Sequence, residues 1–180
     1  MLGLLILFVG CLAVIGGSGT ETETETASSD KEEKKTSRKG EETVAMGQPI
    51  RVGDVQWTVT DARQTNQLVQ QGVSPQFAKT EQGNYVVVDF EFVNNGSDAL
   101  TLDNESLKLV DSQGRESGAS SDQFFYVPRD KQIFLERVNP GVTKPGEAIF
   151  QVAPDASGFR LQAGDAKMFT DQNGYVELGF

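Results

Sequence analysis

The chain has 180 residues, with 26 acidic and 16 basic side chains, so its formal net charge is −10. It contains no histidine and a single cysteine, Cys11. These counts exclude Ser-His and Cys-His nucleophiles, an imidazole metal site, an intrachain disulfide and a thiolate zinc cluster. The acidic balance argues against nucleic acid as a partner, since phosphate binding needs a basic face. We therefore expect no catalytic residues, no metal site and no cofactor.

The N-terminal residues 1–17 are predicted to be a membrane anchor or a targeting signal. Residues 2–15 form an apolar run without a charge. As a transmembrane helix this run is short, because residues 2–17 rise only about 24 Å against a hydrocarbon core of about 30 Å. As a lipoprotein signal it offers residues 8–11 (FVGC), which resemble a lipobox and make Cys11 the lipidation candidate. As a cleaved secretory signal it lacks the basic n-region.

Residues 18–43 are predicted to be a disordered linker rich in Thr, Glu and Lys. They include eight acidic and five basic residues, no aromatic residue, and no aliphatic residue larger than Ala. Such a segment cannot bury enough apolar surface to offset the entropy lost on ordering. Because it lies between a predicted anchor and a predicted domain, we interpret it as a spacer.

Residues 44–180 are predicted to form an all-β domain, and residues 85–93 are its clearest strand. Four apolar side chains alternate along one face of this strand: Val86, Val88, Phe90 and Phe92. Asp89 and Glu91 belong to the other face. This alternation indicates one buried face and one face in water.

The rest of the domain shows short apolar segments separated by turn signals every 8 to 12 residues, which is typical of a sandwich or barrel. One segment, 52–59, places Val55, Trp57 and Val59 on one face, so Trp57 is a core candidate. The single helix candidate is 65–71. The remaining predicted strands are 99–102, 107–110, 133–138, 148–152, 159–161 and 175–178.

Four sequence segments carry a resemblance to a known family. They are residues 50–54 (IRVGD), 85–95 (YVVVDFEFVNN), 107–114 (LKLVDSQG) and 139–152 (NPGVTKPGEAIFQV). The chain resembles a bacterial domain-of-unknown-function family of membrane-anchored extracytoplasmic proteins, similar in architecture to a small secreted mycobacterial antigen. The resemblance covers residues 46–180 and implies an immunoglobulin-like antiparallel β-sandwich. It implies no activity and no functional residues.

One segment combines aromatic and basic residues and is the candidate ligand patch: Phe124, Phe125, Tyr126 and Arg129. It could bind a peptide, a glycan or a lipid head group. The favoured interpretation is that the rings close the open end of the core, because aromatic side chains dominate core burial.

Two other groups of polar residues are expected to be structural. The carboxylates between residues 98 and 111 lack the spacing of a calcium loop, so we expect solvated acidic loops there: Asp98, Asp103, Glu105 and Asp111. Asn94, ahead of Asn95-Gly96, is interpreted as a turn residue at a strand end.

The predicted function is a non-enzymatic β-sandwich module that residues 1–17 hold at the cell membrane, with its domain on the extracytoplasmic side. Its partner would be an unknown protein or envelope ligand. The alternatives are a structural subunit of an envelope complex and a carboxylate-dependent hydrolase. The hydrolase is the weakest, because the sequence offers no histidine and no nucleophile elbow.

Overall fold

The structure is a computed structural model, and it describes residues 42–167 and 172–180. The predicted anchor 1–17, including Cys11, lies outside the described residues, as does the predicted linker up to residue 41. Within the described ranges, no helix has the length and apolar character needed to span a membrane.

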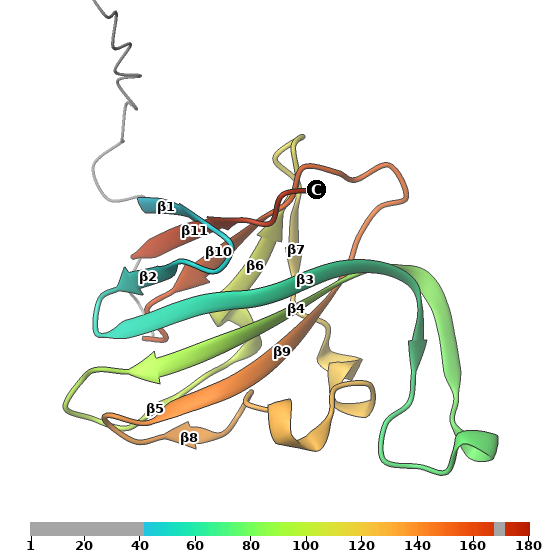
Figure 1. Ribbon diagram of the computed structural model, residues 1–180, viewed down its shortest axis with the longest axis horizontal. Helices are drawn as coiled ribbons and strands as arrows, with labels where there is room; N and C mark the ends of the chain where they lie inside the picture. The colour runs from blue at the N-terminus through green and yellow to red at the C-terminus, as the bar shows by residue number, and fades with distance from the viewer. Residues whose placement is uncertain (1–41, 168–171) are drawn as a thin grey trace, which may run out of the picture. The chain divides into compact units, whose positions relative to one another are not determined.

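Two sheets lie face to face and form a β-sandwich (Figure 1). The five-stranded sheet has the order β1 (Glu42–Ala45), β11 (Asn173–Glu177), β10 (Arg160–Gly164), β6 (Leu107–Val110) and β7 (Glu116–Gly118). The four-stranded sheet has the order β2 (Pro49–Val52), β3 (Val55–Val69), β4 (Thr80–Asn94) and β9 (Thr143–Gln151). A short third pair joins β5 (Leu100–Thr101) to β8 (Arg137–Val138).

The expected all-β antiparallel sandwich is confirmed. One pair of strands departs from the antiparallel rule, because β1 runs parallel to β11. Strand β1 begins at Glu42, two residues before the predicted start of the domain. The described part of the chain also contains four 3-10 turns: η1 (Pro75–Phe77), η2 (Asn104–Ser106), η3 (Ser121–Phe125) and η4 (Arg129–Lys131).

The main core fills the space between the sheets. The predicted inward residues of β3 and β4 are all buried there, including Trp57, Phe90 and Phe92. The Trp57 ring centroid lies 5.3 Å from that of Phe90 and 4.8 Å from that of Phe92. Its Nε1–H donates a hydrogen bond to the carbonyl of Gly164 on β10, 2.9 Å away, and so links the two sheets. Buried indole N–H groups require such a partner.

A second apolar cluster lies on the outer face of the four-stranded sheet. It joins Leu68 of β3, Tyr85 and Val87 of β4, and Ile149 of β9 to Val127, which follows η3. The segment that carries η3 and η4 therefore covers part of the outer face. Strand β4 is consequently buried on both faces in its middle, as strands beneath a covering layer are.

This cover overturns one prediction about β4. Asp89 was expected to face water, but only 8% of its surface is exposed. Glu91, two residues further along the same face, is exposed as predicted. The alternation assigned the correct face to both residues. It could not reveal that another segment packs over part of that face.

Two predicted elements are wrong. Residues 65–71 are not a helix, because β3 continues to Val69 and pairs with β4 as far as Thr80. Cross-strand pairing supplies the backbone hydrogen bonds that a short polar helix would otherwise have to form alone. Residues 133–138 are mostly loop, and only Arg137–Val138 pair as β8. Leu135 has a φ of 67°, a left-handed conformation that interrupts any strand there.

Two polar residues are more deeply placed than their loops suggest. Asn94 is fully buried, and its Nδ2 donates to the carbonyls of Asp98 (2.7 Å) and Val138 (3.0 Å), so its role as a turn residue extends to holding β8. Asp111 was expected to be solvated but is buried. It accepts hydrogen bonds from Arg115, with 2.5 Å between Arg115 Nε and Asp111 Oδ2.

Candidate functional site

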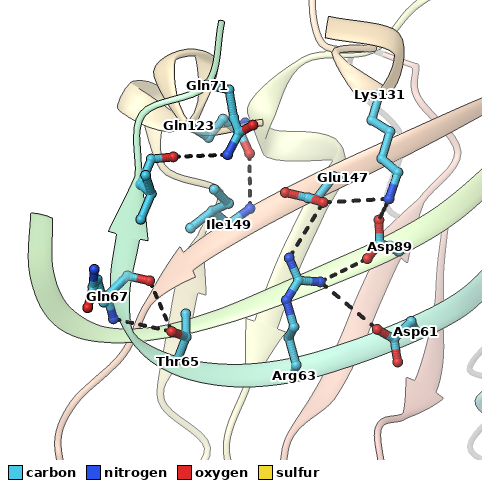
Figure 2. A network of polar contacts seen from close by, with 11 residues as sticks. Asp61, Arg63, Thr65, Gln67, Gln71, Asp89, Gln123, Lys131, Glu147 and Ile149 are labelled. Carbon is cyan, nitrogen blue, oxygen red and sulfur yellow. Dashed lines mark hydrogen bonds and ion pairs between the residues drawn. The ribbon is translucent and has the colours of Figure 1, made fainter. Parts of the chain in front are cut away.

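Three carboxylates lie in one row across the outer face of the four-stranded sheet. Asp61 of β3 is the register partner of Asp89 of β4, and Asp89 is the register partner of Glu147 of β9. Like charges directly opposite each other on neighbouring strands repel. Two cations offset this repulsion: Arg63, from β3, and Lys131, from η4 (Figure 2). We call these five residues the ion-pair cluster.

Asp89 is at the centre of the ion-pair cluster. Arg63 Nη1 donates to Asp89 Oδ2 at 3.0 Å, and Lys131 Nζ donates to Asp89 Oδ1. Glu147 is held less closely, since its Oε2 lies 3.7 Å from both Arg63 Nη2 and Lys131 Nζ. Asp61 is the outermost member, 4.0 Å from Arg63 Nη1. Lys131 thereby ties η4 to the sheet beneath it.

Burial is the main cause that raises the pKa of Glu147 above its ordinary value, and the neighbouring charge of Asp89 raises it further. The side-chain hydrogen bond with Asp89 raises the pKa of Lys131. Both carboxylates are directed at protein cations rather than flanking a space for a scissile bond, as a hydrolase pair would. Glu147 is therefore a buried acceptor whose charge is incompletely compensated.

Sequence reasoning missed the ion-pair cluster. Its members come from four elements, and two of them, Arg63 and Asp89, are 26 residues apart. Asp89 and Glu147 come together only through the register between β4 and β9. The hydrophobic pattern of one strand does not determine how it pairs with a strand far away in the sequence. The one usable signal was the charge of Asp89 within a strongly apolar strand.

The predicted ligand patch is divided by the structure. Phe124 and Phe125 are 64% and 51% exposed, with ring centroids 5.6 Å apart. Tyr126 is half-buried and packs against the second apolar cluster. The favoured interpretation, that the rings close the core, is thus wrong for both phenylalanines. Leu135 joins them as a third exposed apolar side chain, at 81%. We call Phe124, Phe125 and Leu135 the aromatic patch.

Polar side chains behind the patch hold its backbone in place. Gln123 is buried, and its Oε1 accepts a hydrogen bond from the N–H of Ile149 at 3.0 Å. Gln132 Nε2 donates to the carbonyls of Phe124 and Val127, both at 2.9 Å. Gln123 thus ties η3 to β9, and Gln132 ties the segment after η4 to the carbonyl groups at the end of η3. Arg129, the fourth predicted patch residue, is exposed on η4.

A small pocket of about 100 Å³ connects the patch to the ion-pair cluster. Its walls include Gln123, Phe124, Gln132, Phe134, Leu135 and Glu147. Substrate and cofactor sites are usually about 300–1,000 Å³. The pocket therefore has the volume for one side chain. In residues 42–167 and 172–180, no group of three or more acidic, cysteine or histidine side chains is placed to hold a metal ion.

The family model of a domain of unknown function, DUF4352, matches residues 44–173, and the chain belongs to this family. The expected family resemblance is confirmed. No curated protein sequence matches the chain.

Solved structures share its fold at low sequence identity. The yjhA protein of Bacillus subtilis is 11% identical with a TM-score of 0.53, covering 74% of this chain and 97% of its own. The secreted protein MPT63 of Mycobacterium tuberculosis is 12% identical with a TM-score of 0.52, covering 75% and 95%. The candidate lipoprotein ycdA of Bacillus subtilis is 13% identical with a TM-score of 0.50, covering 74% and 39%.

Proposed function

We propose that this chain is a non-enzymatic binding module held at the cell membrane, with its β-sandwich outside the cell, and that it binds a protein ligand through the aromatic patch. The observation that carries the proposal is the exposure of Phe124 and Leu135 at one pocket, together with the exposed Phe125 ring that contacts Phe124. Single exposed apolar residues need no explanation, whereas grouped ones are typical of interaction surfaces.

The local structure supports a binding role for the patch. Leu135 is exposed while its backbone adopts a left-handed conformation, which costs free energy for a bulky residue. Exposed aromatic rings on a loop that the Gln123 and Gln132 amides hold in place lose little entropy when they bind. Phenylalanine is also among the residues enriched in the centres of protein interfaces.

Placement outside the cell is supported by two features. The apolar run 2–15 and the polar residues 18–43 have the order of an anchor and a spacer. The fold is shared with a secreted protein and with a candidate lipoprotein. A non-enzymatic role is supported by the ion-pair cluster, where Asp89 and Glu147 face Arg63 and Lys131 rather than an open cleft.

Photo-crosslinking in living cells tests the binding surface. A benzoyl-phenylalanine at position 125 of the full chain should yield a discrete species of higher mass. The same probe at Phe180, the exposed last residue of the sequence, is the matched control and should yield none. The Phe124→Ser change should reduce the species formed from position 125. Equal crosslinking from both positions, or none from either, would count against the patch.

A further inference from the structure

Among the described residues that line the pocket between the aromatic patch and the ion-pair cluster, Glu147 is the one with a charged side chain. The Nε2 of Gln132 is already engaged by two backbone carbonyls, and that of Gln123 donates to Asn104 Oδ1 at 3.3 Å. Within the described part of the chain, no group donates a hydrogen bond to Gln132 Oε1. The carboxylate of Glu147 therefore favours a ligand with a cationic group that donates hydrogen bonds.

Glu147 is the strongest of these acceptors. Its side chain is only 5% exposed, and it shares a side-chain hydrogen bond with the neighbouring carboxyl group of Asp89. Its two cations are 3.7 Å away, beyond the usual hydrogen-bond distance of about 2.7–3.2 Å. Both ion pairs use Oε2, and in Figure 2 the other carboxylate oxygen points away from Arg63 and Lys131. Glu147 therefore has unused accepting capacity.

The mouth of the pocket has the opposite character from its base. Phe124, Phe134 and Leu135 provide apolar walls, and Phe124 and Leu135 are largely exposed. An alkyl chain would bury surface against these side chains, while a cationic group at its end would reach the carboxylate. Among protein side chains, lysine combines these two features: a flexible alkyl stem and a compact terminal ammonium with three hydrogen-bond donors.

We propose that this pocket binds one lysine side chain of a protein partner, with its stem against Phe124 and Leu135 and its ammonium at Glu147. The proposal rests on the proposed function and names the group that the surface recognises. Arginine fits less well, because Glu147 Oε2 already faces Arg63 and Lys131, which leaves one oxygen where bidentate binding of a guanidinium uses two, and because the pocket is only about 100 Å³.

The test compares three short peptides on the full chain in detergent micelles, with backbone amide signals followed by NMR. The peptides are acetyl-Gly-X-Gly-amide, where X is lysine, norleucine or acetyl-lysine. Norleucine keeps the stem without the ammonium, and acetyl-lysine keeps the length without the charge. The lysine peptide should shift the signals of Phe124 and Ile149 saturably, with a Kd at least about tenfold lower than either neutral peptide, as expected for a charge-assisted hydrogen bond.

Variants locate the effect on the protein. Glu147→Gln should bring the affinity for the lysine peptide down to that for norleucine. Glu105→Gln makes the same charge change at an exposed carboxylate and should leave all affinities unchanged. Leu135→Gly removes one apolar wall and should weaken the lysine and norleucine peptides together. If Glu147→Gln does not fold, the comparison of the three peptides on the wild-type protein still tests whether the pocket prefers lysine.

Equal affinity for the lysine and norleucine peptides would overturn the proposal, and so would the absence of any saturable shift. Either result leaves the crosslinking at position 125 as a separate measure of the proposed function. A crosslink at that position without lysine preference would mean that the patch binds its partner through apolar contact alone. A lysine preference without a crosslink would retain the pocket and reject the protein ligand.

Discussion

Asp89 and Glu147 are directly opposite each other on β4 and β9, and both are buried. Two carboxylates in this position repel each other and lose hydration. They are retained because Arg63 comes from the neighbouring strand and Lys131 from η4. The same contacts dock the segment that presents Phe124 and Phe125. The ion-pair cluster is therefore the structural support of the proposed binding surface.

The Asp89→Ala change should destabilise the protein strongly, because it leaves Arg63 and Lys131 without their closest partner. Breaking a buried ion pair from one side typically costs about 3–5 kcal/mol. Glu91→Ala, on the same strand face but exposed, is the control and should stay within about 0.5 kcal/mol. Urea unfolding measures both. Equal effects would mean that the cluster contributes no more than a surface carboxylate.

The stability of the protein should depend on pH through Glu147. Its pKa in the folded protein is raised above the ordinary value of 4.5. Between those two values the folded state binds more protons than the unfolded state, so the free energy of unfolding falls as pH rises through this window. Acidification from neutral pH toward 4.5 should thus stabilise the wild type relative to Glu147→Gln. Urea unfolding of both proteins across this range tests the prediction, and parallel pH profiles would contradict it.

The Gly146→Ala change should destabilise the core. A Cβ at this position would lie 2.4 Å from Phe90 Cζ and 2.8 Å from Ile133 Cγ2, so the buried ring would have to move. Overpacking of this kind typically costs about 1–3 kcal/mol. Gly118→Ala in β7 is a matched control, because a Cβ there meets nothing within 4 Å. Thermal unfolding of the two variants should separate them by several degrees, with only Gly146→Ala below the wild type.

Asn94→Ala should destabilise the end of β4. The side chain is buried and donates to Asp98 and Val138, while its Oδ1 accepts from the N–H of Gly96 at 2.9 Å. Each buried group left without a partner costs about 1–3 kcal/mol, so we expect a loss of at least about 2 kcal/mol. Asn95→Ala, at the exposed neighbour, should have little effect. Similar losses from both changes would show that the turn alone matters.

The Cys11→Ser change separates the anchor hypotheses. A lipid-anchored protein would lose its membrane attachment or fail to mature, because the thiol carries the lipid. A transmembrane helix would keep the variant in the membrane fraction, since Cys11 would be one small residue in an apolar run. Cell fractionation followed by blotting distinguishes the two. Wild-type protein recovered at full length in the cytoplasmic fraction would contradict both hypotheses.

Sequence pattern alone identified the sandwich and its principal core. The alternation of residues 85–93 placed Phe90 and Phe92 inward, and the structure buries both. Such patterns can be recognised in the sequence because a strand between a core and water must alternate apolar and polar side chains with a period of two residues. The family resemblance rested on the same packing and turn residues. It therefore predicted a fold but no activity and no functional residues.

The tertiary structure decided which polar and aromatic residues lie together. Pairing between β4 and β9 placed Asp89 against Glu147, 58 residues apart in the chain. Docking of η3 and η4 buried Asp89 and exposed Phe124, the reverse of what each residue type suggests. The alternation of apolar and polar residues along a strand shows only which face of the sheet a side chain lies on. Whether that face meets water depends on long-range packing, and that packing created both the ion-pair cluster and the pocket beside it.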